Sequence, residues 1–346
     1  MSAKETDESE SQTHSAGVQN SSDNKPKLST KRDSSWPSVL FYIHLNILGL
    51  YGIVVLFTNT CFTTVIFTSF LTGIGILGVT CGAHRLWAHH SYTASTSLKI
   101  VLMLCQTMAG QGSIYDWVKN HRLHHETFRT SNDPYYSEKE FIDAHVFAQI
   151  RSLSPHQEEM LKAVDMKDLE SDKVVMFQKR FYWILYFVFF VLLPINAPLE
   201  YWNDSVQAAI FVAFSLRYLI VLNATWLVNS SHFIWGLDKR YKPSDSNMIF
   251  LVTKTNWPQY HYLLPWDYQT GEFGSYGTGC TTGFIRVFAA LGLATDLQTM
   301  TSDAVKTGLI RAVDTNRPVV ECLTEAGREA MQTIPSDHYL TKDKYK

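Results

Sequence analysis

Residues 62–90 read FTTVIFTSFLTGIGILGVTCGAHRLWAHH, and this stretch decides the fold. Residues 62–80 contain no charged side chain. At ~1.5 Å rise per residue, a helix of this length crosses the ~30 Å hydrocarbon core of a bilayer. The residues that follow carry three histidines, His84, His89 and His90. The stretch therefore predicts a membrane-spanning helix that delivers imidazoles to one face of the membrane.

Three further apolar runs are long enough to span a bilayer: residues 39–57, 181–198 and 206–228. The links 58–61 and 199–205 are short, so consecutive runs would form two antiparallel hairpins. Residues 98–109 are apolar but too short to span, and we expect an interfacial or buried helix there. Arg217 lies inside the last run, where a charge is costly unless it is paired within the bundle. The sequence predicts an all-α integral membrane protein with four transmembrane helices.

Positively charged residues predict how these spans are oriented. Both short links lack Lys and Arg. Basic residues lie instead toward the other ends of the spans: Lys27, Lys31, Arg32, Arg85, Lys119, Arg122, Lys179, Arg180, Lys239 and Arg240. By the positive-inside rule, both termini and the long segments outside the hairpins would face the cytosol. A helical cytosolic cap would thus carry the histidines.

Composition divides the chain further and excludes some functions. Residues 1–35 contain no Phe, Tyr, Trp or Ile, which predicts a disordered cytosolic tail. We expect the membrane domain over residues 36–300 and a C-terminal cytosolic tail over residues 301–346. The formal net charge of −2, with both signs intermixed, excludes the basic footprint of a nucleic-acid binder. Five cysteines without paired spacing indicate neither a disulfide framework nor a thiolate metal site.

The histidines are grouped rather than scattered. On a helix, His121, His124 and His125 would share one face, because steps of three and four residues return to a similar azimuth. His84 and His89 would differ by roughly 140° on a regular α-helix, so they would flank a site and could contact two different metals. Imidazole suits iron, copper, nickel and zinc. Two hypotheses stay open: a pair of metals that activates oxygen, or histidines that only hydrogen-bond across a buried polar layer.

Five motifs in a fixed order make the pattern recognisable. They are GAHRLWAH (82–89), QGSIYDWVKNHRLHH (111–125), LNATWLVNS (222–230), PWDY (265–268) and TTGF (281–284). In this order they resemble the membrane-bound fatty acyl-CoA desaturases of the stearoyl-CoA (Δ9-type) family, in an insect-like form, over residues 36–297. The resemblance implies a mushroom-shaped helical protein in the endoplasmic reticulum membrane, with two irons in its cytosolic cap. There O2 would insert a cis double bond into a saturated fatty acyl-CoA, with electrons from cytochrome b5.

The resemblance also implies roles for individual residues. Metal-ligand positions of the family are matched by His84, His89, His121, His124, His125, His261 and Asn229. Positions that line the bend of the acyl chain are matched by Gln111, Trp117, Thr225 and Trp226. Lys139 matches a basic position that holds phosphate in relatives.

Three departures from the family pattern concern the metal centre. Phe233, Pro258 and Tyr262 stand where the family has histidines, and His90 and His232 are the spare imidazoles nearby. Because even a lost supporting partner typically costs ~10- to 100-fold in metal affinity or activity, we expect reduced iron occupancy and impaired desaturation. Two functions stay open: a desaturase with an unconventional iron site, or a non-catalytic relative that binds acyl chains or regulates true desaturases. A transporter would leave the acyl-lining motifs unexplained.

Overall fold

The structure is a computed structural model that describes residues 32–128, 130–135, 141–235, 257–270, 272 and 276–332. Four helices are long and apolar enough to cross a membrane: Trp36–Thr58, Phe62–Ala88, Lys173–Trp202 and Ala208–Ser230. Each contains one of the four predicted runs or nearly all of it. The prediction of an all-α integral membrane protein with four spans is therefore confirmed.

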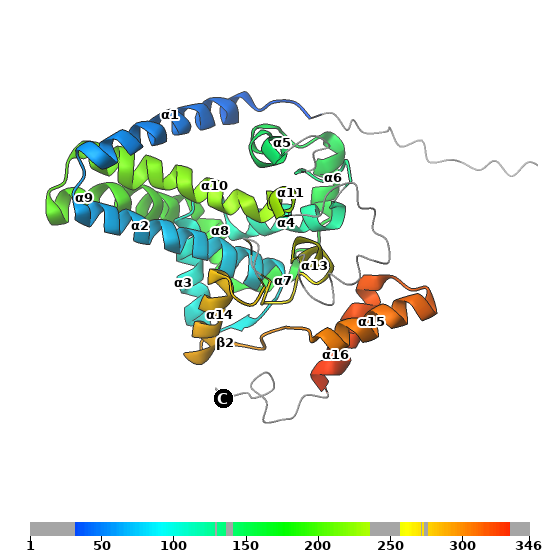
Figure 1. Ribbon diagram of the computed structural model, residues 1–346. Coiled ribbons are helices and arrows are strands. Elements are labelled where there is room, and N and C mark those ends of the chain that lie inside the picture. Colours follow the sequence, from blue (N-terminus) through cyan, green and yellow to red (C-terminus); the bar gives the residue numbers. More distant parts are fainter. Residues whose placement is uncertain are drawn as a thin grey trace, which may run out of the picture.

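The spans are built from α-helical and π-helical segments. The first is α1 (Trp36–Thr58), and the second joins α2 (Phe62–Leu77) to the π-helix η1 (Gly78–Ala88). The third joins α8 (Lys173–Leu185), η3 (Tyr186–Leu192) and α9 (Leu193–Trp202). The fourth joins η4 (Ala208–Leu216) and α10 (Arg217–Ser230). The spans lie side by side in Figure 1.

The third span begins earlier than the apolar run that predicted it. Asp172 caps the start of α8, where its carboxylate accepts hydrogen bonds from the backbone N–H groups of Val174 and Val175. The same carboxylate also accepts from Trp87 and from Lys99. A kink at Phe181, whose φ is −106° and ψ 15°, marks the point where the apolar run starts. The polar first turns thus belong to the cap, and the apolar remainder to the bundle.

The two short links lie together at one end of the bundle. The Asp204 carboxylate accepts hydrogen bonds from the backbone N–H of Cys61, at 3.0 Å, and from the Thr64 hydroxyl. The Ser205 hydroxyl donates to the Asn59 carbonyl at 3.2 Å. Both hairpins therefore turn at the same end, opposite the cap (Figure 1).

The cap consists of short helices and one small strand pair. Its elements are β1 (Thr93–Ala94), α3 (Thr96–Thr107), α4 (Ile114–Thr127), α5 (Phe141–His145), η2 (Phe147–Ile150), α6 (Pro155–Ala163), α7 (Lys167–Ser171), α11 (His232–Trp235), α13 (Trp257–Leu263), α14 (Cys280–Ala290) and β2 (Ala294–Thr295). The strands pair antiparallel. The main apolar core lies where η1, α3, α4, α8 and α14 meet, and it includes Leu102, Ile114, Val118, Leu123, Val175 and Ile285. This core fixes η1, which carries His84, against α4, which carries His121, His124 and His125.

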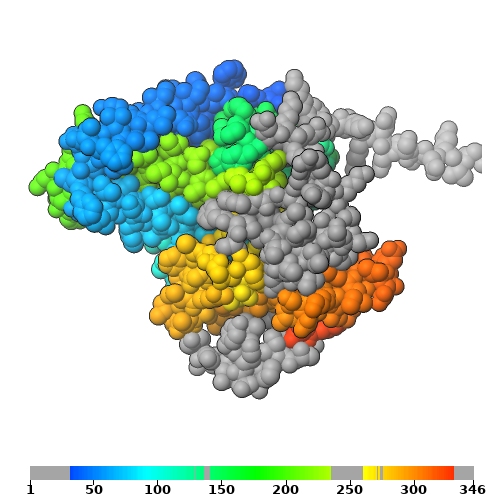
Figure 2. Space-filling model, in the orientation of Figure 1, coloured from blue at the N-terminus to red at the C-terminus, as the bar shows by residue number. Residues whose placement is uncertain are grey.

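Residues 302–332 form two helices, α15 (Ser302–Thr315) and α16 (Val319–Gln332), drawn orange to red in Figure 2. One apolar cluster connects this pair to the end of α13, and it contains Tyr260, Leu264, Met300, Val305, Leu309 and Leu323. The expected boundary at residue 300 falls inside this cluster. The sequence predicted a C-terminal tail here and not two helices. Their apolar residues pack against Tyr260 and Leu264, which are far from them in the sequence.

Candidate metal centre

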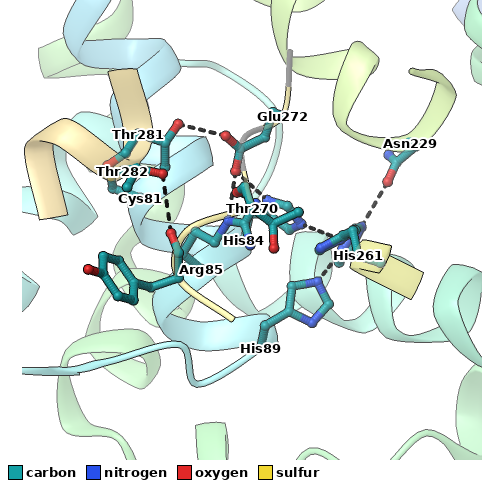
Figure 3. Close-up of polar contacts among 12 residues, drawn as sticks. Cys81, His84, Arg85, His89, Asn229, His261, Thr270, Glu272, Thr281 and Thr282 are labelled. Carbon is teal, nitrogen blue, oxygen red and sulfur yellow. Dashed lines mark hydrogen bonds and ion pairs between the residues drawn. The ribbon is translucent and has the colours of Figure 1, made fainter. Parts of the chain in front are cut away.

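Five histidines converge at the base of the cap: His84, His89, His121, His125 and His261. We call them the five-histidine group. One ring nitrogen from each lies within 4.8 Å of those of all the others. Among the residues that the structure describes, this is the single group of three or more His, Cys, Asp or Glu side chains with such geometry. Three separate elements, η1, α4 and α13, bring it together (Figure 3).

The π-helix explains why His84 and His89 belong to one group. The His89 N–H donates to the His84 carbonyl at 3.1 Å, a bond between residues five apart. Such a bond places the fifth residue near the first, instead of roughly 140° away as in a regular α-helix. The two ring centroids are 4.8 Å apart. The expectation that these histidines flank the site is therefore wrong, because it assumed an α-helix.

On α4, His121 and His125 face the group and His124 does not join it. The helix starts at Ser113, whose hydroxyl accepts a hydrogen bond from the Asp116 N–H at 3.1 Å. His124 places Nδ1 2.8 Å from Asp133 Oδ1 and Nε2 2.8 Å from the Tyr262 hydroxyl. As a result, this predicted ligand lies beside the five-histidine group with both nitrogens engaged.

A buried carboxylate that sequence reasoning missed orients His84. Glu272 Oε1 accepts from His84 Nδ1 and from Arg85 Nε, each at 2.9 Å, and Glu272 Oε2 accepts from the Thr281 hydroxyl at 2.6 Å (Figure 3). Burial alone would raise the pKa of Glu272, but the Arg85 charge and the His84 hydrogen bond lower it to about 2. The ionised carboxylate keeps the proton of His84 on Nδ1, so Nε2 faces the group with a free lone pair. Glu272 is the single acidic residue in 269–281. An isolated carboxylate between the PWDY and TTGF motifs is the sequence feature that could have indicated its role.

Asn229, predicted as a ligand, orients His121 in a similar way. Its Oδ1 lies 2.8 Å from His121 Nδ1, which fixes that proton and turns Nε2 inward. His121 Nε2 is 2.9 Å from His89 Nε2, and His84 Nε2 is 3.2 Å from His261 Nε2. Nitrogen pairs this close need a proton or a cation between them.

The donor set fits a transition metal. Burial, followed by the charges of neighbouring groups, lowers the pKa of His89, His121, His125 and His261 well below the usual range, so these rings are neutral at pH 7. His125 Nε2 and His261 Nδ1 are buried without a hydrogen-bond partner. Neutral imidazoles with unpaired nitrogens are the donors that iron, copper, nickel and zinc accept.

A second metal would need donors in the adjoining region, where no further group of three or more His, Cys, Asp or Glu side chains converges among the described residues. We call Phe128, His124, His232 and Tyr262 the Tyr262 region. The rings of Phe128 and Tyr262 stack, with centroids 3.3 Å apart. The centroid of the His232 ring lies 5.1 Å from that of Phe128 and 5.9 Å from that of Tyr262. His232 does not belong to the five-histidine group. His90 is 62% exposed and pairs with Asp168 at 3.0 Å, so it faces away.

A cavity of about 380 Å³ adjoins the group and gathers the predicted substrate residues. Gln111, Trp117, Thr225, Trp226 and Asn229 all line it. Trp117 Nε1 donates to Gln111 Oε1 at 3.2 Å, and Gln111 Nε2 donates to the Thr225 hydroxyl. Trp117 also stacks on His121, with ring centroids 5.0 Å apart. One wall of the cavity therefore contacts the five-histidine group.

The lining of this cavity combines polar and apolar side chains. The charged and polar ones outside the spans include Arg32, Asp116, Asn120, Gln149 and Arg151. Tyr42, Tyr218 and Leu222 come from the first and fourth spans. Lys139 lies outside the described residues. The cavity is thus amphiphilic, and both the cap and the bundle contribute to its lining.

Comparison with known proteins places the chain in a family. No protein-family model matches it. It is 39% identical over 299 residues to the acyl-CoA Delta-9 desaturase of Acheta domesticus, which covers 85% of this chain and 83% of the relative. It is 38% identical over 289 residues to the acyl-CoA Delta-12 desaturase of Tribolium castaneum (82% and 80%) and 36% identical over 293 residues to the stearoyl-CoA desaturase of Homo sapiens (83% and 81%). With similarity of this extent added to the four spans and the histidine group, the chain belongs to the acyl-CoA desaturase family.

Proposed function

We propose that this protein binds a fatty acyl-CoA in the amphiphilic cavity and one iron ion at the five-histidine group, with impaired desaturation. The observation that carries the proposal is the contact between cavity and group through Trp117 and His121. It supports a ligand whose middle lies against the metal.

The lining of the cavity supports the acyl-CoA. Arg32 and Arg151 place positive charge in the lining, which suits an anionic nucleotide end, while Arg32 is held by backbone carbonyls and Arg151 pairs with Asp143. Tyr42, Tyr218 and Leu222 add apolar surface that suits an alkyl chain. Gln111 and Thr225 line the same cavity, and Gln111 contacts the Trp117 that stacks on His121, so they can position the chain beside His121.

The chemistry follows the family reaction: Δ9-type insertion of a cis double bond with O2, and with cytochrome b5 as the electron donor. Iron, when bound, supplies the redox chemistry with O2. The residues of this chain contribute the orientation of two imidazoles, through Glu272 and Asn229, and the burial of His84, His89, His121 and His261. The membrane would be that of the endoplasmic reticulum, with both termini and the cap in the cytosol, because basic residues cluster at the cap end.

Impairment is proposed because, among the described residues, no second group of imidazoles converges beside the first. Tyr262 and Phe128 stack beside His124, and neither His90 nor His232 belongs to the five-histidine group. Losing even a supporting partner costs ~10- to 100-fold in metal affinity or activity, and here three ligand positions differ. The protein would then serve as an acyl-chain-binding or regulatory relative of true desaturases.

A working desaturase with an unconventional metal site is the second candidate. It is favoured by the convergence of five imidazoles and by the carboxylate and amide that orient two of them. The two candidates differ in one measurable quantity, which is the formation of monounsaturated acyl chains.

Expression in a yeast that lacks its own desaturase tests the proposal. We expect the wild-type chain to yield no new monounsaturated fatty acid, and a Phe233→His/Pro258→His/Tyr262→His variant at equal membrane abundance to yield more. His121→Ala, which removes a histidine of the group, is the matched inactive control. Monounsaturated product from the wild-type chain, absent from His121→Ala, would establish the second candidate and fix the position of the double bond.

A further inference from the structure

His261 is held differently from the oriented histidines of the five-histidine group. Glu272 and Asn229 each accept a hydrogen bond from the outer nitrogen of one histidine. His261 is 3% exposed, and its Nε2 lies 3.2 Å from His84 Nε2 (Figure 3). Its Nδ1 has no hydrogen-bond partner among the described residues. The position of this ring therefore depends on the placement of α13, the helix that carries it.

Tyr260, the residue before His261, anchors α13. Its side chain is fully buried, and its hydroxyl donates to Asp267 Oδ2 at 2.7 Å. The same carboxylate accepts from the Tyr276 hydroxyl and from the backbone N–H of Gln269, each at 2.9 Å. The helix has only 7 residues, so its stability comes from such contacts. Because consecutive helical residues point roughly 100° apart, an anchored Tyr260 fixes the direction of His261.

Asp267 also connects this anchor to the π-helix that carries His84. The Asp267 backbone carbonyl accepts a hydrogen bond from Arg85 Nη1 at 3.1 Å, and Arg85 follows His84 in η1. Asp267 itself is fully buried. An unbroken series of hydrogen bonds and covalent bonds therefore links His84 to His261. The intermediate residues are Arg85, Asp267 and Tyr260.

The α15–α16 hairpin supports the same anchor. Tyr260 and Leu264 share an apolar cluster with three residues of the hairpin, Val305, Leu309 and Leu323. All five are at most 5% exposed. Burial of their apolar surface holds the hairpin against the end of α13.

Two glycines allow the close packing of the hairpin. A Cβ atom on Gly308 of α15 would lie 2.9 Å from the Leu323 Cα of α16. A Cβ atom on Gly327 of α16 would lie 3.2 Å from the Trp266 ring, in the segment between α13 and Asp267. One added methyl group at residue 308 can therefore loosen the hairpin without changing any residue of α13.

We propose that Asp267 and the α15–α16 hairpin together position His261 for metal binding, through Tyr260. The inference rests on the proposed function, because it requires that the five-histidine group binds a metal ion. A ligand that is already held in place loses less conformational freedom when the metal binds, which raises the affinity. Glu272 thus orients His84 through its ring, whereas Asp267 and Tyr260 are positioning residues that act on His261 through the backbone.

Titration of the purified full chain in nanodiscs with Co²⁺, followed by visible absorption, tests this inference in two backgrounds. We expect Tyr260→Phe, which removes only the hydroxyl, to weaken Co²⁺ binding about 10-fold in the wild-type chain and to change the absorption bands. In a His261→Ala background the same substitution should have no further effect, since the residue that it positions is gone. Tyr201→Phe, at a tyrosine that is 82% exposed, is the matched control.

Two further substitutions test the carboxylate and the hairpin separately. Asp267→Ala should weaken Co²⁺ binding as Tyr260→Phe does, and Asp267→Asn, which keeps an acceptor oxygen, should partly restore it. Gly308→Ala should weaken binding only while His261 is present. Gly283→Ala is its matched control, because a Cβ atom on this residue of α14 would meet no atom within 4 Å.

The outcomes separate the two proposals. No Co²⁺ binding by the wild-type chain overturns the metal site and the positioning of His261 together. Binding that His261→Ala leaves unchanged overturns the positioning, while the other four histidines stand as the metal site. Equal losses in both backgrounds, or no loss in either, also overturn it. Tyr260→Phe removes one oxygen atom and Gly308→Ala adds one carbon atom, so either variant that folds by circular dichroism is sufficient.

Discussion

The five-histidine group and the Tyr262 region contain the same kind of donor, yet they differ in what meets the inward-facing nitrogen. In the group, Glu272 and Asn229 hold the outer nitrogens of His84 and His121, and the inner nitrogens face other imidazoles. His124 is held from outside by Asp133 in the same manner, but its inner nitrogen meets the Tyr262 hydroxyl. An oriented histidine is thus not sufficient to join the five-histidine group. The residue that faces its inner nitrogen also differs between the two regions.

Removal of a histidine from the group should have the largest effect. We expect His125→Ala to weaken metal binding at least ~100-fold, because a direct ligand is worth more than the supporting partners that cost ~10- to 100-fold. Titration of the purified protein with Fe²⁺ or Co²⁺, followed by its absorption spectrum, measures this. His90→Ala is the control, since His90 is exposed and pairs with Asp168. Equal weakening by both variants would show that the group does not bind the metal.

Loss of the carboxylate behind His84 should have an intermediate effect. Glu272→Gln keeps the size of the side chain but removes the charge that keeps the His84 proton on Nδ1, so metal affinity should fall about 10- to 100-fold. Glu159→Gln, on the surface of α6 beside Lys162, is the matched control. The same titration measures both. Unchanged affinity in Glu272→Gln would mean that Arg85 and the packing around His84 suffice to orient the ring.

Conversion of the Tyr262 region should have the smallest effect and sharpens the comparison most. Tyr262→His replaces the phenol opposite His124 by an imidazole, and we expect the metal content to rise above one ion per chain. Tyr262→Phe removes the hydroxyl without adding a donor and should stay at one. Elemental analysis of the purified variants measures the ratio. A ratio of one in Tyr262→His would show that the phenol alone does not prevent a second site.

The spans could be predicted from the sequence because long apolar runs have few other places in a folded protein. The convergence of His84 and His89 could not, since it depends on a π-helix and the expectation used α-helical geometry. Gln111, Trp117 and Thr225, which the family resemblance assigns together to the acyl chain, line one cavity in the structure. Spacing along the chain would not have shown that, because Gln111 and Thr225 are 114 residues apart.

The residues behind the histidines were the hardest to predict. Glu272 lies 188 residues from His84 along the chain and has no neighbouring histidine in the sequence. His124 shares its helix with His121 and His125, and only the position of Tyr262 distinguishes it from them. Both contacts, His84 with Glu272 and His124 with Tyr262, join segments that are far apart in the sequence. Local sequence patterns do not predict how such segments are placed relative to each other.

The hydrogen bonds of Asp204 have a mechanical consequence. They join the two hairpins at the end of the bundle that is farthest from the histidines. A rotation of one hairpin against the other about this junction displaces the atoms near it least and those of the cap most. Such a rotation would therefore move the cap, and with it the cavity lined by Arg32 and Arg151, more than the turns at the opposite end of the spans.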